Sequence, residues 1–480
     1  MGGLCLVRNT QLIALAVLAL AAGWAAPAER GECPPADPAA PRTLVLALDG
    51  VPLRSVREAI DQGAFAGWPE PQALISTFPS VTNVAFSAIL RPFGVAPAGG
   101  YEVQHFDRGK NEVVGGSPFG YQDRLYAWRD AFDVTSRTFG SKLKTYTRTR
   151  KACHDAVDEA EELLLESPKE LILAHVGATD ALVHLRGDKA TLKFLLELDR
   201  RLIELKQVHA ARTGRPLRLV LLSDHGNSAV KIHKAAGLHK ALRRAGLDVV
   251  EHLEEPGDVV APTFGIVGYG ALFTYEENAE TAGHAVVGNR TVDVAAWLAA
   301  PDEMIVLSSS GRAVVRWRRD LLGGWSISYD PTEGDPLGFR PLVDRLGADG
   351  RRSVDGFVHE DDWFAATVGT EYPDALRRLI HSLTGTYVEN YATVVFSLEH
   401  GYAWGWTAAH LSSRLNGGRL EGTHGGLDAV SSVGFFMTDD PATQPSSAVR
   451  SEQALANFAA SRDCLVVAGD DDPKHPHPGM

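Results

Sequence analysis

The chain alternates between short apolar runs and longer segments whose apolar positions recur with helical spacing. Three apolar runs show no polar alternation, which is typical of strands buried on both faces of a parallel sheet; they lie at Thr43 to Leu48, Glu170 to His175 and Leu219 to Leu222. Helical spacing recurs between them, at residues 152–166 and 191–209. Because strands that alternate with helices form parallel sheets covered on both faces, we predict a three-layer α/β/α sandwich with a mostly parallel central sheet.

Other segments add shorter elements to this core. Met304 to Leu307 and Ala313 to Trp317, with Ser and Gly between them, predict a β-hairpin. The stretch from about residue 321 to 374 is rich in Gly, Asp, Arg and Pro, and we expect an insertion or cap there rather than sheet core. The remaining predictions are helices at 53–59 and near 233–245, and strands at 73–76, 393–398 and 433–437.

The two ends of the chain differ from its middle. Arg8 precedes a short apolar stretch from Leu12 to Ala22, and Ala26-Pro27-Ala28 offers a small-x-small cleavage site, so residues 1–28 predict a secretory signal. An uncleaved membrane anchor is the alternative, although the apolar stretch is short for a span. We therefore expect a secreted or periplasmic protein with no transmembrane segment after cleavage. A flexible lead-in at 29–42, one large domain at 43–469 and a disordered tail at 470–480 complete the predicted organisation.

Charge and cysteine content narrow the classes of function. The formal net charge of −13 leaves no basic footprint for nucleic acid, so we expect no nucleic-acid scaffold as a partner. An anionic substrate would need local positive charge, such as metal ions, against this acidic background. The cysteines outside the signal are Cys33, Cys153 and Cys464. Their odd number allows at most one disulfide within the chain, and the lack of CxxC spacing argues against a thiolate metal site.

Metal-competent side chains follow the predicted strands. Asp49 comes directly after the first apolar run, and Asp224-His225 comes one residue after the third. Open α/β sheets place their ligands at these carboxyl ends of strands. Asp180 and His184 lie four residues apart, so on a helical turn they point the same way. With His424, this set offers three carboxylates and three imidazoles, enough for two sites of three protein ligands each.

Thr82 is the candidate nucleophile. It ends the stretch Phe78-Pro79-Ser80-Val81-Thr82, immediately before an apolar, helix-like run that continues to Leu90. A helix N-terminus directs backbone N–H groups at an anion such as a phosphoryl group. A free threonine hydroxyl is a poor nucleophile at neutral pH, but coordination to a dication activates it. The alternative is that Thr82 only caps the helix, because threonine is favoured at that position.

Five short motifs occur in an order that resembles the alkaline phosphatase superfamily, and most closely its nucleotide pyrophosphatase/phosphodiesterase-like branch. They are Leu48-Asp49-Gly50, Phe78 to Thr82, Asp180-x-x-x-His184, Ser223-Asp224-His225-Gly226 and Gly422-Thr423-His424-Gly425. Together they span most of the chain after the predicted signal. The resemblance implies an alkaline phosphatase-like catalytic domain at 43–469 and a hydrolase acting on phosphoric ester bonds.

The resemblance also implies a role for each residue. Thr82 would coordinate one of two Zn²⁺ ions and attack phosphorus, which forms a phospho-threonine that water then hydrolyses. Mn²⁺ suits the same ligand types. The implied substrate is a small-molecule phosphate mono- or diester. The implied ligand sets are Asp180, His184 and His424 for one ion, and Asp49, Asp224 and His225 for the ion that Thr82 joins.

Two further points concern the substrate. The diesterase branch carries an Asn in the loop after the nucleophile's helix, but residues 99–107 of this chain contain none. We expect Asn83 to bind the phosphate oxygen instead, with a backbone N–H as the alternative. A phosphonate or sulfate ester hydrolase of the same superfamily is an alternative, although its sulfatases use a modified Cys or Ser where this chain has Thr82. A non-catalytic metal-binding envelope protein is another, and it would predict loss of a ligand or of the nucleophile.

Overall fold

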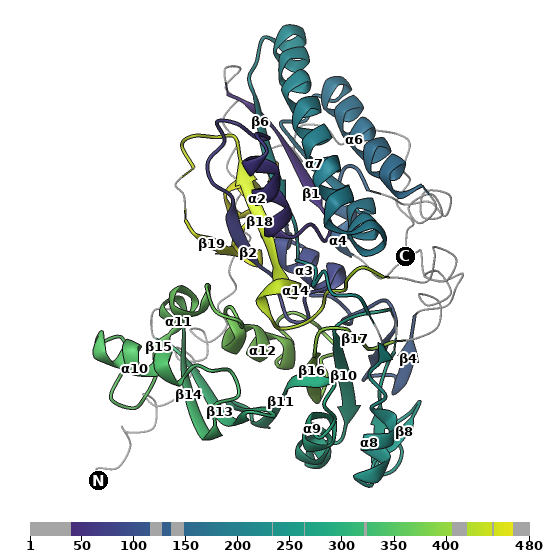
Figure 1. Ribbon diagram of the computed structural model, residues 1–480, viewed down its shortest axis with the longest axis vertical. Coiled ribbons are helices and arrows are strands. Elements are labelled where there is room, and N and C mark those ends of the chain that lie inside the picture. Colours follow the sequence, from purple (N-terminus) through teal and green to yellow (C-terminus); the bar gives the residue numbers. More distant parts are fainter. Residues whose placement is uncertain are drawn as a thin grey trace, which may run out of the picture. The chain divides into compact units, whose positions relative to one another are not determined.

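Figure 1 shows the computed structural model of the chain. The structure describes residues 40–115, 127–135, 148–232, 234–263, 265–320, 324–405, 420–443 and 446–463. The predicted signal, most of the predicted lead-in, and the predicted tail lie outside the described residues, as do Cys33 and Cys464.

The first sheet has six strands in the order β19-β2-β18-β6-β1-β5. β1 pairs in parallel with β5 and with β6, and β2 pairs in parallel with β19. Only β18 runs against its neighbours, β2 and β6, which confirms the mostly parallel central sheet. The bounds are β1 (Arg42–Leu48), β2 (Gln72–Ile75), β5 (Leu171–Val176), β6 (Leu217–Leu222), β18 (Val433–Thr438) and β19 (Ala448–Arg450).

Helices cover both faces of this sheet. Successive residues of a strand point to opposite faces, and here both sets of side chains are apolar, so each face needs a covering layer. Leu46 of β1 packs in one apolar core with Val157 and Phe194, whereas the preceding Val45 packs in another core with Phe86. The predicted three-layer α/β/α arrangement is therefore confirmed (Figure 1). The helices are α2 (Leu53–Asp61), α6 (Thr149–Glu166) and α7 (Ala178–Thr213) on one face, and α3 (Thr82–Ile89), α4 (Ala127–Asp130) and α15 (Ala456–Asp463) on the other.

The longest helix, α7, begins earlier than its apolar pattern predicts, at Ala178. It is broken at Gly187, whose φ of 68° lies in the left-handed region that favours glycine. Close to this break, the carbonyl of His184 accepts a hydrogen bond from the backbone N–H of Glu421 at 2.8 Å. The first part of α7 therefore holds Asp180 and His184 on successive turns and ties them to the loop at Glu421.

A second sheet, which the sequence patterns do not predict as a separate layer, has nine strands in the order β15-β14-β13-β12-β11-β16-β10-β9-β8. The predicted β-hairpin is confirmed, since β12 and β13 pair antiparallel. Helix α9 packs on one face of this sheet and α12 on the other. The bounds are β8 (Asp248–Val250), β9 (Asp258–Val260), β10 (Tyr269–Thr274), α9 (Ala279–Val287), β11 (Val292–Ala300), β12 (Glu303–Ser308), β13 (Gly311–Arg319), β14 (Trp325–Gly334), β15 (Val358–His359), α12 (Ala375–Leu383) and β16 (Val394–Leu398).

Two expectations for this half of the chain need correction. The region from about 321 to 374 is not wholly a cap outside the sheet, because β14 pairs with β13 along its length. The helix predicted near 233–245 is shorter, and β7 precedes it and pairs with β17. The remaining bounds are β7 (Lys234–Ala235), α8 (His239–Arg244), α10 (Arg340–Ala348), α11 (Glu360–Thr367), β17 (Tyr402–Ala403) and α14 (Ala429–Ser432), with the hairpin β3 (His105–Asp107) and β4 (Glu112–Val114) after α3.

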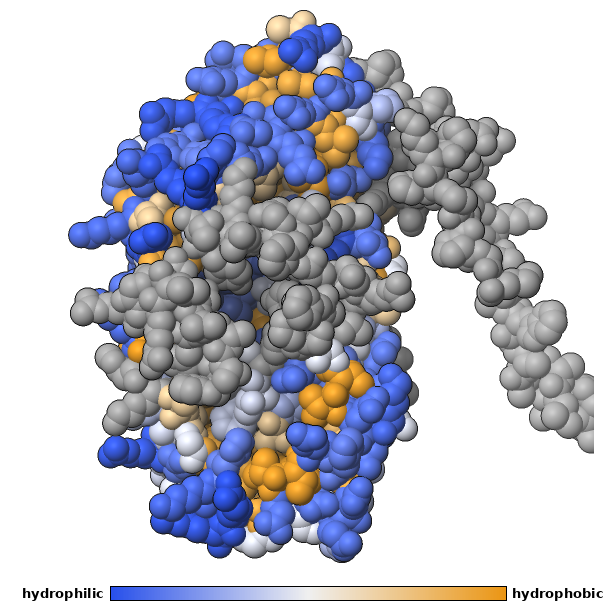
Figure 2. All heavy atoms as spheres, turned by 90° about the vertical axis from the view of Figure 1, so that its right-hand side faces the viewer, coloured by the Kyte–Doolittle hydropathy of each residue, from blue (hydrophilic) through white to orange (hydrophobic). Residues whose placement is uncertain are grey.

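Hydrophilic side chains predominate on the face of the molecule that Figure 2 shows, and apolar ones form separate patches on it. No helix in the described part of the chain combines the length and apolarity needed to cross a membrane. Cys153 of α6 is buried and forms no disulfide, and burial raises the pKa of its thiol to about 12.

Candidate metal centre

The candidate ligands lie at the carboxyl edge of the first sheet. Asp49 follows β1 directly, and Asp224-His225 follows β6 after one residue. Asp180 and His184 lie near the start of α7, which follows β5 after one residue. His424 comes from the loop that precedes α14 and β18. The topology therefore brings together side chains from four segments that are far apart in the sequence.

One group of ligand atoms belongs to Asp49, Asp224 and His225, and these atoms lie within 4.8 Å of one another. His225 Nε2 is 3.6 Å from Asp49 Oδ1 and 3.4 Å from Asp224 Oδ2. All three side chains are buried. This group has the composition that the sequence motifs imply for one of the two ions.

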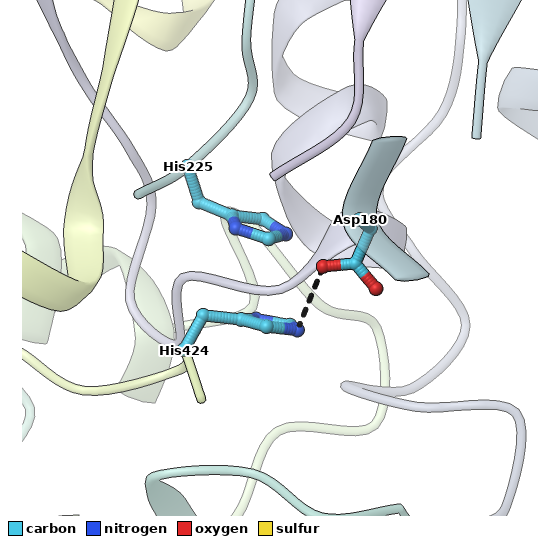
Figure 3. Close-up of side chains that lie close together, drawn as sticks. All are labelled: Asp180, His225 and His424. Atoms are coloured by element: carbon cyan, nitrogen blue, oxygen red, sulfur yellow. Dashed lines mark ion pairs between the residues drawn. The ribbon is translucent and has the colours of Figure 1, made fainter. Parts of the chain in front are cut away.

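A second group consists of Asp180, His225 and His424, whose ligand atoms also lie within 4.8 Å of one another. The rings of His225 and His424 stack at 3.9 Å between centroids, and Asp180 faces them from α7 (Figure 3). The sequence motifs place His184 in this set instead of His225. His184 Nε2 lies 3.1 Å from Asp180 Oδ1, so it flanks the second group, and His225 lies between the two groups.

Each imidazole is oriented by a backbone carbonyl on the far side of its ring. The Nδ1 atoms of His184, His225 and His424 lie 2.7, 2.9 and 2.9 Å from the carbonyl oxygens of Gly422, Gly226 and Ser80. When Nδ1 carries the proton and donates it to the carbonyl, Nε2 is left unprotonated. The three Nε2 atoms then present lone pairs toward the carboxylates, which is the tautomer a metal ligand needs.

Burial opposes ionisation of the carboxyl groups in this centre. Burial and then the neighbouring Asp224 and Asp180 raise the pKa of Asp49 well above its usual value. Burial also raises the pKa of Asp224 to about 7. Burial alone would raise the pKa of Asp180 as well, but the imidazoles of His184, His424 and His225 outweigh it and lower that pKa. The centre is thus an electrostatically unfavourable one unless protons or cations enter it.

Two buried oxygens in this centre, Asp180 Oδ1 and Asp224 Oδ2, have imidazole Nε2 atoms at 3.1 and 3.4 Å as neighbours, and these nitrogens carry no proton to donate in the tautomer described above. Each belongs to a different ligand group. Buried carboxylate oxygens that receive no hydrogen are costly in a folded protein unless a cation meets them. Carboxylate oxygens together with imidazole nitrogens are ligands for ions such as Zn²⁺ and Mn²⁺, so the residues present fit two divalent cations.

Thr82 stands beside the first group. Its Oγ1 donates a hydrogen bond to Asp49 Oδ1 at 3.2 Å and lies 3.4 Å from His225 Nε2. Val81, not Thr82, is the N-cap of α3, and no side chain caps this helix end. The helix-cap alternative for Thr82 is therefore wrong, because its hydroxyl turns to the carboxylate instead of to the backbone.

The side chain of Asn83 is used within the fold. Its Nδ2 donates to the carbonyl of Gly100 at 2.7 Å, and its Oδ1 accepts from Trp128 Nε1 at 3.3 Å. These contacts join the start of α3 to the loop that follows it and to α4. Binding of a phosphate oxygen by Asn83 stays a prediction.

His175 is a contributor that sequence reasoning does not single out as functional. Its Nε2 lies 3.0 Å from Asp49 Oδ2, and its Nδ1 lies 3.1 Å from the hydroxyl of Thr135. Burial lowers the pKa of His175 to about 3, so the ring is neutral. Its position at the end of a buried strand beside the strand of Asp49 is the one sequence signal, and an ordinary core histidine would give the same signal.

Comparison with known proteins now identifies the family. The family model for type I phosphodiesterase/nucleotide pyrophosphatase matches residues 72–327, more than half of the chain. No curated protein sequence is similar enough to match. The chain therefore belongs to the type I phosphodiesterase/nucleotide pyrophosphatase family, and it is a hydrolase acting on phosphoric ester bonds. The resemblance carried by the sequence motifs is confirmed at this level.

Several solved structures are similar to this chain. Human ectonucleotide pyrophosphatase/phosphodiesterase 5 has 12% identity and a TM-score of 0.44, over 92% of this chain and 97% of that one. Phosphonoacetate hydrolase from Sinorhizobium meliloti 1021, in complex with phosphonoformate, has 13% identity and a TM-score of 0.45, over 88% and 96%. An inactive form of the murine ectonucleotide enzyme, in complex with AMP, has 11% identity and a TM-score of 0.46, over 92% and 98%.

We expect His175→Phe to weaken metal binding about 10- to 100-fold, because Asp49 loses the imidazole that orients its second oxygen. Phe suits the surroundings, since Phe86, Trp128 and Phe132 pack around the ring. Competition with a chromophoric chelator measures the affinity. His154→Gln on α6 is the matched control, and an affinity equal to that of the unmodified protein in both variants would contradict the role given to His175.

We also expect the free energy of unfolding of the metal-free protein to fall as the pH rises above about 6.5. Above this pH the imidazoles of the unfolded chain are already neutral, so they no longer contribute to the pH dependence. Folding raises the pKa of Asp224 from 3.8 to about 7 and raises that of Asp49. Such a group stabilises the folded state below 3.8 and loses this contribution as pH rises through about 7.

Bound dications take the place of these protons, so the gap in melting temperature between Zn²⁺-loaded and stripped protein should widen between about pH 6.5 and 8. Scanning calorimetry of both forms measures it. Asp224→Asn removes one titrating group and should reduce the widening. A gap that stays constant or narrows with pH would show that the carboxylates are not protonated in the stripped protein.

Proposed function

We propose that the chain hydrolyses small-molecule phosphate mono- or diesters by nucleophilic attack of Thr82, with two divalent cations as cofactors. The observation that carries this proposal is the hydrogen bond from Thr82 Oγ1 to Asp49 Oδ1 beside the buried ligand group. A hydroxyl that caps no helix and instead meets a buried carboxylate is positioned to lose its proton. The family supports phosphoester hydrolysis, and Thr82 lies within the matched residues.

The reaction divides into two displacements at phosphorus. In the first, a bond forms between Thr82 Oγ1 and phosphorus while the ester P–O bond breaks, and the released alkoxide takes up a proton as it leaves as the alcohol. In the second, water attacks the phospho-threonine, the bond from phosphorus to Oγ1 breaks, and Thr82 recovers its proton. Asp49 orients the hydroxyl for the first displacement. The N-terminus of α3 presents backbone N–H groups to the phosphoryl oxygens.

The proposed cofactors are two Zn²⁺, with Mn²⁺ as the other ion that this donor set suits. Asp49, Asp224 and His225 would hold one ion together with Thr82. Asp180, His424 and His184 would hold the other, and the position of His225 allows it to support this set as well. When bound, the ions lower the pKa of coordinated hydroxyl groups and offset the charge of the phosphoryl group.

Substitution of Thr82 tests the nucleophile. We expect Thr82→Ala to lower kcat/KM for aryl phosphate esters about 10³-fold or more, because the attacking oxygen is gone. Thr82→Ser keeps a hydroxyl and should restore a large part of the rate. Thr332→Ala, which removes an exposed hydroxyl on β14, is the matched control.

A second measurement separates the covalent route from direct attack by water. Acid quench with ³²P-labelled substrate should trap label on the protein with Thr82 present and none in Thr82→Ala. Hydrolysis that continues unchanged in Thr82→Ala would contradict the assignment. Steady-state rates of hydrolysis on phosphonates and sulfates decide between phosphate esters and the other ester classes of the superfamily.

We further propose that residues 1–28 direct export, so that the enzyme acts outside the cytoplasm. The support is the sequence pattern of Arg8, the apolar stretch from Leu12 to Ala22, and the small residues at 26–28. Expression in a bacterial host followed by fractionation should place the protein in the periplasm or medium, and intact mass should show loss of about 28 residues. Full-length protein retained in the membrane fraction would favour the uncleaved anchor instead.

A further inference from the structure

A cavity lies beside the metal centre, between the loop after α3 and the start of β10. Its empty volume is about 330 Å³, part of which is open to solvent. Its enclosed part is narrow, with room for a group about the size of a water molecule or an ammonium ion. The walls used below come from Tyr101, Glu102, Gln104, Val267, Tyr269 and Trp404.

Both sides of this cavity are tied to the proposed catalytic residues. On one side, Asn83, the neighbour of Thr82, donates to the carbonyl of Gly100, which immediately precedes the wall residue Tyr101. On the other side, Gly268 N donates to His424 O at 2.6 Å, between the wall residues Val267 and Tyr269. The two walls of the cavity are therefore attached to the segments that carry Thr82 and His424, and Glu102 lies close enough to Asp180 to feel its charge.

The aromatic walls are fixed in place. The hydroxyl of Tyr101 donates to the carbonyl of Ser382 at 3.0 Å, and the indole N–H of Trp404 donates to the carbonyl of Pro262 at 2.9 Å. The rings of Tyr101 and Tyr269 lie edge to face with centroids 6.1 Å apart. A rigid aromatic wall beside an acidic side chain attracts cations, because the faces of aromatic rings are electronegative.

Glu102 is the one acidic residue among the described walls of this cavity. No arginine or lysine among the described residues forms an ion pair with it, and its carboxylate has no described hydrogen bond. Burial, followed by the charge of Asp180, raises the pKa of Glu102 to about 8. A carboxylate in this situation gains much from a cation that enters with the substrate. The amide of Gln104 in the same wall adds a second acceptor.

We propose that this cavity is a subsite for a protonated primary amine carried by the substrate, with Glu102 as its counter-ion. The proposal rests on the proposed function, because the amine is expected on an ester group of a phosphate held at the metal centre. An ammonium group has three N–H donors, which match the carboxylate of Glu102 and the amide oxygen of Gln104. A second phosphate or carboxylate in this position would find no arginine or lysine among the described wall residues.

The test compares two ligands of equal size that differ in charge, 2-aminoethyl phosphate and propyl phosphate. Calorimetric titration uses Zn²⁺-loaded protein that carries Thr82→Ala, so that binding is read without turnover. We expect 2-aminoethyl phosphate to bind about tenfold tighter or more, as hydrogen bonds to charged groups predict. Adding Glu102→Gln should remove this difference, whereas adding Glu112→Gln, at an exposed position on β4, should keep it.

The titration distinguishes failure of the amine subsite from failure of the proposed catalytic mechanism. If Thr82 proves not to be the nucleophile, the ratio of the two affinities can still be measured, because the titration needs no hydrolysis. Equal affinities for the two ligands, or a preference that survives Glu102→Gln, would overturn the amine subsite. If neither ligand binds, the metal centre does not hold phosphate esters, and both proposals fall together. The kcat/KM ratio for the two corresponding 4-nitrophenyl diesters, measured with Thr82 present, gives an independent second reading of the same preference.

Discussion

The site depends on one electrostatic constraint: carboxylates are buried next to one another at the edge of a parallel sheet. Asp49 and Asp224 meet around His225; burial and then the charge of Asp224 raise the pKa of Asp49, and burial raises the pKa of Asp224. Ionised carboxylates in this position would destabilise the fold if no cation were present, because like charges repel strongly when no water screens them. Divalent cations would remove this repulsion and would provide positive charge for a phosphate ester in a chain whose net charge is −13.

A helix that packs on the second sheet holds two loops next to this centre. Arg378 of α12 is buried and donates to the carbonyls of Thr77, before α3, and Leu427, after His424, at 3.0 and 2.8 Å. One guanidinium therefore joins the segment before Thr82 to the loop that carries His424. The second sheet, through α12, supports the geometry of the first.

Much of the fold follows from the sequence, but not all of it. The runs that contain Leu46 and Val220 are apolar on both faces, so their residues alone indicate strands of a covered parallel sheet. The antiparallel second sheet gives weaker signals: in β14, Ile327 and Tyr329 are buried within a stretch rich in Gly, Asp and Arg, so composition alone indicates a cap. Sheet membership there is decided by pairing with β13, which a local pattern does not contain.

The residues of the site could be gathered from motif order, but their detailed contacts could not. His225 lies between the two ligand groups, and His175 contacts Asp49, because of how neighbouring strands and loops stack in space. Likewise, Asn83 turns to Gly100 and Trp128, which are distant in sequence. Such contacts arise from tertiary packing and leave no spacing signature along the chain.

The most direct test of the account is the number of divalent ions held by each folded chain. Equilibrium dialysis against Zn²⁺ followed by elemental analysis, with circular dichroism to verify folding, counts them. The account predicts two ions per chain, one for each group of buried ligands. A folded chain that retains none, or only one at saturation, would contradict it.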